Sequence, residues 1–169
     1  RVDLLLDAVP ALRARVPDCA VLLVGDGPER PEMERRVQQR SQQDVVRFAG
    51  AVHHDQLPRY VSCFDVAVVP HSNDYGSPMK VFEYMAAGIP VVAPDLGPLR
   101  DAMTSGVEGL LFKPLDRDAL QDALASVLGD ERARERMGQA GRRNIEAVHN
   151  WERHADRLLQ FFSSRALAR

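Results

Sequence analysis

The chain has 169 residues, of which 45% are apolar, and its 22 basic and 24 acidic side chains give a formal net charge of -2. This length and composition fit one folded domain, since globular domains usually hold about 100–150 residues, and they exclude a wholly disordered chain. The balanced charge argues against a protein that binds duplex nucleic acid, which would present a basic face. No apolar run approaches the roughly 18 residues that a membrane span needs.

Short apolar runs alternate with helical patterns along most of the chain. Apolar residues at helical spacing predict a helix at Val2–Val16, and Pro10 inside it is expected to kink the helix or delay its start. The later apolar runs are predicted strands, separated by helices and turns. The strands are expected at Ala20–Gly25, Val45–Gly50, Asp65–Pro70 and Pro90–Ala93, with a weak fifth at Leu110–Phe112, and the helices at Pro31–Arg40, Asp55–Cys63 and Met79–Ala87.

The strand runs are apolar on both faces, which is typical of a parallel sheet covered by helices. Their alternation with helices predicts an α/β fold of the Rossmann-like, doubly wound type, with helices on both faces of a parallel sheet. We expect residues 1–169 to form a single domain that ends in a C-terminal helix at residues 151–165.

Three helices are predicted in the C-terminal third. Asp116 is expected to cap the first, and Gly129 to end it. The second covers roughly Glu131–Val148. The third begins after Asn150, and we expect its apolar stripe to pack on the sheet domain, with partial exposure if the chain is a fragment. The stripe consists of Trp151, Ala155, Leu158, Leu159 and Phe162.

The segment His71–Pro94 is the most informative part of the sequence. Ser77 is a good N-cap and Pro78 suits the first position of the helix that follows. That helix would begin at the carboxyl end of a parallel strand, the edge where open α/β sheets bind ligands. A helix N-terminus carries about half a positive elementary charge, and Lys80 adds a cation there, so a bound phosphate is expected. The plainer alternative is a surface ion pair between Lys80 and Glu83.

The segment Tyr75–Ala93 (YGSPMKVFEYMAAGIPVVA) is similar to the donor-site signature of glycosyltransferase family 4. This family is a group of retaining enzymes with the GT-B fold. Further segments resemble the same family in the same serial order, so the resemblance covers nearly the whole chain. These segments are Leu22–Pro28, Val46–Val52, Asp65–His71, Ser105–Phe112 and Asn150–Trp151. The resemblance implies the C-terminal, donor-binding half of a retaining hexosyltransferase.

The resemblance also implies roles for single residues. Lys80 would bind the donor diphosphate, and Glu83 would accept hydrogen bonds from the ribose hydroxyls. Tyr75, with Asp74 beside it, stands where the family usually has a glutamate that contacts the donor sugar, so Lys80, Tyr75 and Asp74 are the catalytic candidates. The donor-binding candidates are Gly25, Val52, His53, Gly76, Ser77, Pro78, Met79, Lys80, Val81 and Glu83.

The resemblance implies a nucleotide-sugar donor and neither a cofactor nor a metal, because the helix dipole and basic side chains stabilise the departing nucleotide diphosphate. The acceptor would be a glycan or a lipid-linked molecule, held by an N-terminal domain outside this chain, so we expect the chain alone to be inactive. No nucleic-acid partner and no transmembrane segment are expected. The implied location is the cytoplasm, or the inner face of the membrane as a peripheral protein.

The family's first strand of this domain lies between the strands predicted at Ala20–Gly25 and Asp65–Pro70, and this chain starts after it. Two sheet edges would then face a gap with unpaired backbone groups. We therefore expect the chain alone to be unstable. The alternative is that the two strands pair directly.

Two other functions are kept open. The chain could be a non-catalytic nucleotide-binding module in which Tyr75 marks a decayed site. A Rossmann NAD(P)-binding domain is suggested by Gly25-Asp26-Gly27, but the third glycine of that fingerprint is replaced by Arg30. Asp116-Arg117-Asp118 is expected to cap a helix and not to bind metal. The histidines at positions 53, 54 and 71 are too scattered to predict a metal site. The two cysteines, Cys19 and Cys63, are expected to fill small apolar spaces.

Overall fold

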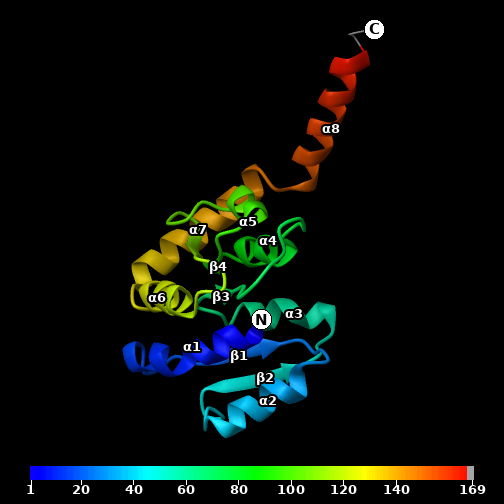
Figure 1. The fold of residues 1–169 in the computed structure, drawn as a ribbon. Helices are drawn as coiled ribbons and strands as arrows, with labels where there is room; N and C mark the ends of the chain where they lie inside the picture. Colours follow the sequence, from blue (N-terminus) through cyan, green and yellow to red (C-terminus); the bar gives the residue numbers. More distant parts are fainter. Residues whose placement is uncertain (167–169) are drawn as a thin grey trace.

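The computed structural model describes residues 1–166, which form an α/β fold with parallel strands (Figure 1). The strands are β1 (Val21–Val24), β2 (Val46–Gly50), β3 (Ala67–Val68), β4 (Val91–Pro94) and β5 (Gly109–Phe112). The helices are α1 (Val2–Arg15), α2 (Arg30–Gln39), α3 (Leu57–Val61), α4 (Met79–Ala86), α5 (Gly97–Ala102), α6 (Arg117–Leu128), α7 (Glu131–Ala147) and α8 (Trp151–Ala166), with a 3-10 turn η1 (His54–Gln56) before α3. The predicted elements are present within a few residues of their expected bounds, and α5 is an addition to them.

The strands form two separate sheets. β1 pairs with β2, and β3, β4 and β5 form a second parallel sheet in that order. No hydrogen-bonded ladder joins β1 to β3 within residues 1–166, so the alternative of direct pairing between these strands is wrong. The expected gap is present, and the instability predicted from it stays a prediction. Cooperative thermal unfolding of the chain at low concentration would contradict it.

Strand β4 shows why the sheet needs helices on both faces. Val91 and Ala93 point into an apolar cluster with side chains of α4 and α5, whereas Val92 points the other way, into a cluster with α1 and α6. All three side chains are fully buried. Successive strand residues face opposite sides, so a run without a polar residue requires a helical cover on each side. The predicted fold class is confirmed in this respect.

Pro10 lies inside α1, which begins at Val2, so the predicted late start is wrong. A proline at this position has no N–H for the carbonyl of Leu6, one helical turn earlier. The Nε2 group of the buried Gln42 donates to that carbonyl oxygen at 3.3 Å. The proline is therefore tolerated because a side chain from outside the helix supplies the missing donor.

This compensation predicts a coupling between Pro10 and Gln42. Gln42→Leu should lower the free energy of unfolding by about 1–2 kcal/mol, because it leaves the Leu6 carbonyl buried without a donor. Combined with Pro10→Ala, which restores a backbone N–H at position 10, the same substitution should cost almost nothing. Urea unfolding of the four proteins measures both losses. Equal losses in the two backgrounds would show that the hydrogen bond to Leu6 is not what Gln42 contributes.

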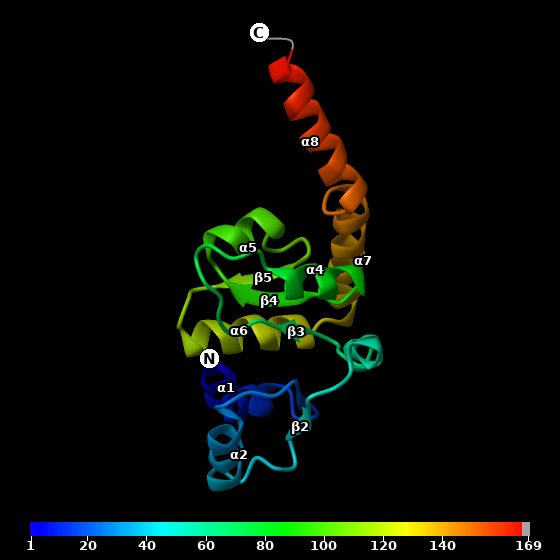
Figure 2. The same ribbon diagram turned by 90° about the vertical axis from the view of Figure 1, so that its right-hand side faces the viewer.

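Helix α8 projects away from the body of the molecule, as both ribbon views show (Figures 1 and 2). Trp151 is 86% exposed and Phe162 64%. The expected packing of the apolar stripe on the sheet domain is therefore wrong. The physical reason is that α4, α5, α6 and α1 already cover both faces of β4, so α8 finds no open face on that strand.

Candidate functional site

The N-terminus of α4 lies beyond the carboxyl end of β3, at the end of a loop without regular structure. The N-cap residue is Pro78, and no side chain caps the helix. The prediction that Ser77 is the N-cap and Pro78 the first helical residue is therefore wrong. The Ser77 hydroxyl instead donates weakly to the sulfur of Met79, at 3.9 Å. The N-terminus of α4 is therefore left without a side-chain cap.

The backbone N–H groups at the start of α4 differ in whether they already donate a hydrogen bond. The Met79 N–H donates to the Ser77 carbonyl and the Val81 N–H to the Pro78 carbonyl, each at 2.9 Å. The Lys80 N–H has no partner in the described part of the chain. Met79, Lys80 and Val81 are all donor-binding candidates. The N–H of Lys80 is free in this conformation, and the other two N–H groups would share an existing hydrogen bond with a bound phosphate.

Lys80 and Glu83 are both exposed side chains on the first turns of α4. Neither forms a salt bridge with any residue that the structure describes, so the alternative of a surface ion pair between them is wrong. The other lysine, Lys113, is engaged, with its ammonium 3.3 Å from the carboxylate of Asp116. Lys80 therefore keeps an uncompensated positive charge beside the positive end of a helix dipole, where an anion would be stabilised.

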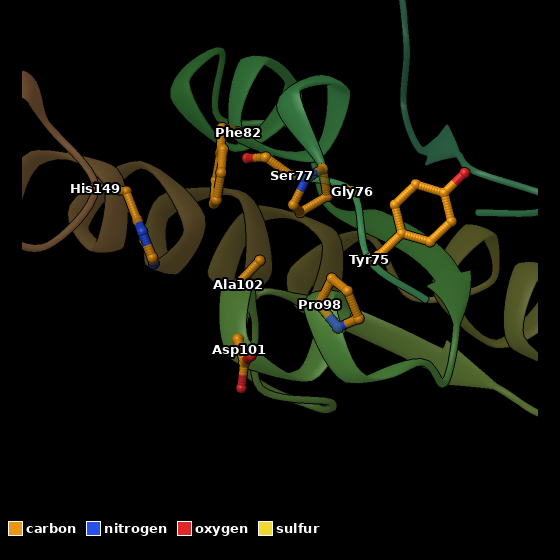
Figure 3. Close-up of a pocket in the computed structure, with 9 residues that line it drawn as sticks. Tyr75, Gly76, Ser77, Phe82, Pro98, Asp101, Ala102 and His149 are labelled. Atoms are coloured by element: carbon orange, nitrogen blue, oxygen red, sulfur yellow. The ribbon is translucent and has the colours of Figure 1, made fainter. Parts of the chain in front are cut away.

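An open depression of about 320 Å³ lies beside this helix end (Figure 3). Its lining comes from the loop before α4, from α4 itself, from α5 and from the segment after α7. The lining residues are Tyr75, Gly76, Ser77, Pro78, Phe82, Pro98, Asp101, Ala102 and His149. Four predicted residues, Tyr75 to Pro78, thus meet at one hollow, whereas Asp74, Lys80 and Glu83 do not line it.

Tyr75 is 89% exposed, and Figure 3 shows its ring directed away from Phe82 and His149. The hydroxyl therefore lies at the outer rim of the depression in this conformation. Asp74, beside it, is also exposed. Their catalytic roles stay predictions.

Five lining residues were missed in the sequence, and two of these form the inner wall. The ring of His149 stacks on that of Phe82, with ring centroids 4.7 Å apart. Burial lowers the pKa of His149, and the nearby His154 and Arg157 lower it further, so the neutral imidazole is favoured. His149 lies 67 residues beyond Phe82 in sequence number, and a sequence pattern holds no local signal for a contact across that interval.

A further missed residue, which lies outside the lining, holds the loop itself. The Asn73 side chain, through Oδ1, accepts hydrogen bonds from the N–H groups of Tyr75 and Gly76, at 3.3 and 2.5 Å. An asparagine two or three residues before such a bend is a recognisable sequence signal, because asparagine side chains bond the backbone just ahead of them.

The remaining predicted donor-binding residues belong to the other sheet. Gly25 follows β1 with a φ of +126° and lies in a bend, and its N–H donates across to the carbonyl of Gly50, the last residue of β2, at 2.8 Å. His53 is exposed, and its Nδ1 accepts from the Asp55 N–H as the cap of η1. Val52 is half-buried. None of these three residues lines the depression beside α4.

The structure also bears on the expectations for Asp116 and for the two cysteines. Asp116 caps α6 by accepting from the N–H groups of Asp118 and Ala119, as predicted. Cys63 is exposed, so its expected role as an apolar filler is wrong, whereas Cys19 is half-buried. Within residues 1–166 no three His, Cys, Asp or Glu side chains gather closely enough to hold a metal ion. None of the described helices combines the length and apolar character needed to cross a membrane.

Comparison with known proteins gives a consistent result. The family model "Glycosyl transferases group 1" matches residues 1–144. A GDP-mannose-dependent alpha-(1-6)-phosphatidylinositol monomannoside mannosyltransferase of Mycolicibacterium smegmatis is 31% identical to the chain over 174 aligned positions. The alignment covers 99% of this chain and 45% of the mannosyltransferase, so the chain spans less than half of that relative.

Two solved structures are similar in fold. Sucrose-phosphate synthase from Thermosynechococcus elongatus superimposes with a TM-score of 0.79 and 32% identity, over 96% of this chain and 42% of the synthase. The C-terminal domain of a group 1 family protein (LpcC) from Francisella tularensis superimposes with a TM-score of 0.79 and 20% identity, over 89% of this chain and 80% of that domain.

Proposed function

Because the chain belongs to the group 1 glycosyl transferases, we propose that it is the donor-binding half of a retaining hexosyltransferase of family 4. The full protein would move a glycosyl group from a nucleotide-diphosphate sugar to an acceptor hydroxyl. The name of the mannosyltransferase relative, which includes GDP-mannose, supports a donor of this class. The chain spans 45% of that relative, and the proposal therefore assigns the activity to a longer protein.

The observation that carries the proposal is the open N-terminus of α4 with an unpaired Lys80 beside it. When the bond between the sugar and the diphosphate breaks, negative charge grows on the departing diphosphate. The helix dipole, the free N–H of Lys80 and its ammonium group would stabilise that charge. Glu83, three residues further along the same helix face, would accept hydrogen bonds from the ribose hydroxyls of the nucleotide.

The acceptor and the location follow from the same proposal. A glycan or lipid-linked acceptor would be held by a domain outside this chain, and the protein would work in the cytoplasm or at the inner face of the membrane. The reaction would require no metal, because the positive helix end and Lys80 supply the charge that a metal ion provides in other nucleotide-sugar sites.

A binding experiment on the full-length protein tests the proposal. Titration calorimetry should show that UDP or GDP binds about tenfold or more tightly than UMP or GMP, because only the diphosphate carries the second phosphate that the helix end and Lys80 would hold. Equal affinity for mono- and diphosphates, or no binding of either, would refute the proposed donor site.

The exposed, outward-directed Tyr75 favours one second candidate, a nucleotide-binding module that no longer transfers sugar. The full-length protein distinguishes the two. A protein that binds a nucleotide sugar but neither transfers nor hydrolyses it is a binding module, whereas release of nucleotide diphosphate with product establishes the transferase.

A further inference from the structure

The loop between β3 and α4 has no strand or helix partner of its own, although it supplies four residues of the depression. Residues 74–76 form a bend, and Asn73 lies just before it. Asn73 Oδ1 accepts from two successive backbone N–H groups, those of Tyr75 and Gly76. This single side chain fixes the direction in which the backbone enters the first turn of α4.

Gly76 is the necessary counterpart of this arrangement. A Cβ atom at position 76 would lie 2.6 Å from Asn73 Oδ1 and 3.0 Å from its Nδ2. Real Cβ atoms essentially never approach a neighbour to 2.6 Å, so any side chain at position 76 would displace the Asn73 carboxamide. The two residues therefore form one unit, in which a short acceptor side chain fits only because its neighbour has no side chain.

We propose that Asn73 is a positioning residue for the donor, which holds Gly76, Ser77 and Pro78 in the geometry that binds a nucleotide diphosphate at the start of α4. This inference rests on the proposed function. A loop that is held before the ligand arrives loses less conformational freedom on binding, and the saved entropy appears as affinity. Asn73 is exposed, so it contributes little to the core, and its effect should be confined to this loop.

The test compares five variants of the full-length protein, four single and the double variant Asn73→Ala/Gly76→Ala, by calorimetric titration with UDP and GDP, beside thermal unfolding. Asn73→Ala removes the acceptor, Asn73→Ser restores an uncharged one, and Gly76→Ala displaces the carboxamide. Asp130→Ala is the matched control, since Asp130 accepts from the Ala133 N–H as the cap of α7, away from the depression.

Asn73→Ala is expected to weaken diphosphate binding about five- to tenfold, the size of a lost capping bond, without moving the unfolding midpoint more than the control does. Asn73→Ser should recover most of the affinity. Gly76→Ala should weaken binding similarly in the wild-type background, and add little to Asn73→Ala, because in that background the space beside position 76 is empty.

The outcomes separate this inference from the proposed function. Wild-type affinity in Asn73→Ala, failure of Asn73→Ser to recover binding, or additive losses in the double variant would overturn the positioning role while the donor site stands. A wild-type chain that binds neither UDP nor GDP would refute the donor site and this role with it.

Discussion

Replacing Gly138 by alanine is expected to lower the free energy of unfolding by about 3 kcal/mol or more, at the upper end of what overpacking costs. Gly138 is buried in the middle of α7, where the helix crosses the end of α4. A Cβ atom there would lie 2.0 Å from the backbone oxygen of Gly88 and 3.0 Å from its carbonyl carbon. Alanine normally stabilises a helix interior by about 1 kcal/mol relative to glycine, so the clash must exceed that gain.

The Gly88 carbonyl cannot easily move aside. Gly88 has a φ of +76° and ends α4, and its N–H donates to the Met85 carbonyl while the next N–H, of Ile89, donates to the Tyr84 carbonyl. The chain then enters β4 at once. Relief of the clash would have to shift α7 away from α4, and α4 is the helix whose other end forms the candidate site.

Gly141 provides a matched control on the same buried face of α7, three residues further on. Its added Cβ would lie 3.2 Å from Met85 Cγ and 3.4 Å from the backbone Cα of Met85, so this neighbour would have to give by only a few tenths of an ångström. Gly141→Ala should therefore cost less than half as much in urea unfolding. Losses of equal size in the two variants, or a Gly138→Ala protein as stable as wild type, would contradict the close approach of α7 to α4.

Lys80→Ala is expected to weaken the binding of UDP and GDP about 10- to 100-fold, the range of a charge-assisted hydrogen bond to phosphate. UMP and GMP should be affected much less. Because Lys80 is exposed, salt should screen its contribution, so the difference between wild type and variant should shrink as sodium chloride rises from 50 mM to 500 mM, roughly the interval over which the screening length falls to a few ångströms.

The chain offers its other lysine as the control. Lys113 also follows the carboxyl end of a strand, β5, but its ammonium is paired with Asp116. Lys113→Ala should leave nucleotide affinity unchanged. A comparable loss from Lys80→Ala and Lys113→Ala would mean that general positive charge at this sheet edge attracts the nucleotide, and that Lys80 has no specific place in the site.

The sequence predicts most of the fold because local chemistry determines those elements. The all-apolar run of β4 specifies a strand covered on both faces, and the Asp116 carboxylate specifies the start of α6 through two backbone N–H groups. Helix α5 escaped prediction because Gly97-Pro98 is typical of a loop. The position of α8 could not be predicted from its apolar stripe. Such a stripe indicates that the helix packs against another apolar surface, but it does not identify that surface.

The sequence predicts some residues of the candidate site and misses others. The loop residues Gly76 to Pro78 line a hollow as expected from their place between a strand and a helix. The capping prediction for Ser77 was wrong because Asn73, further upstream, already determines how the backbone turns. His149 could not be found at all, because its contact with Phe82 depends on how α7 crosses α4 and not on any local pattern.

Binding of a nucleoside diphosphate at the N-terminus of α4 is tested most directly by amide NMR spectra of the isotope-labelled full-length protein, recorded as UDP or GDP is added. The largest signal changes are expected on Gly76, Ser77, Met79, Lys80 and Val81, and Lys80→Ala should reduce them. Changes confined to residues remote from this helix end, such as the turn after β1, with the α4 amides unmoved, would contradict it.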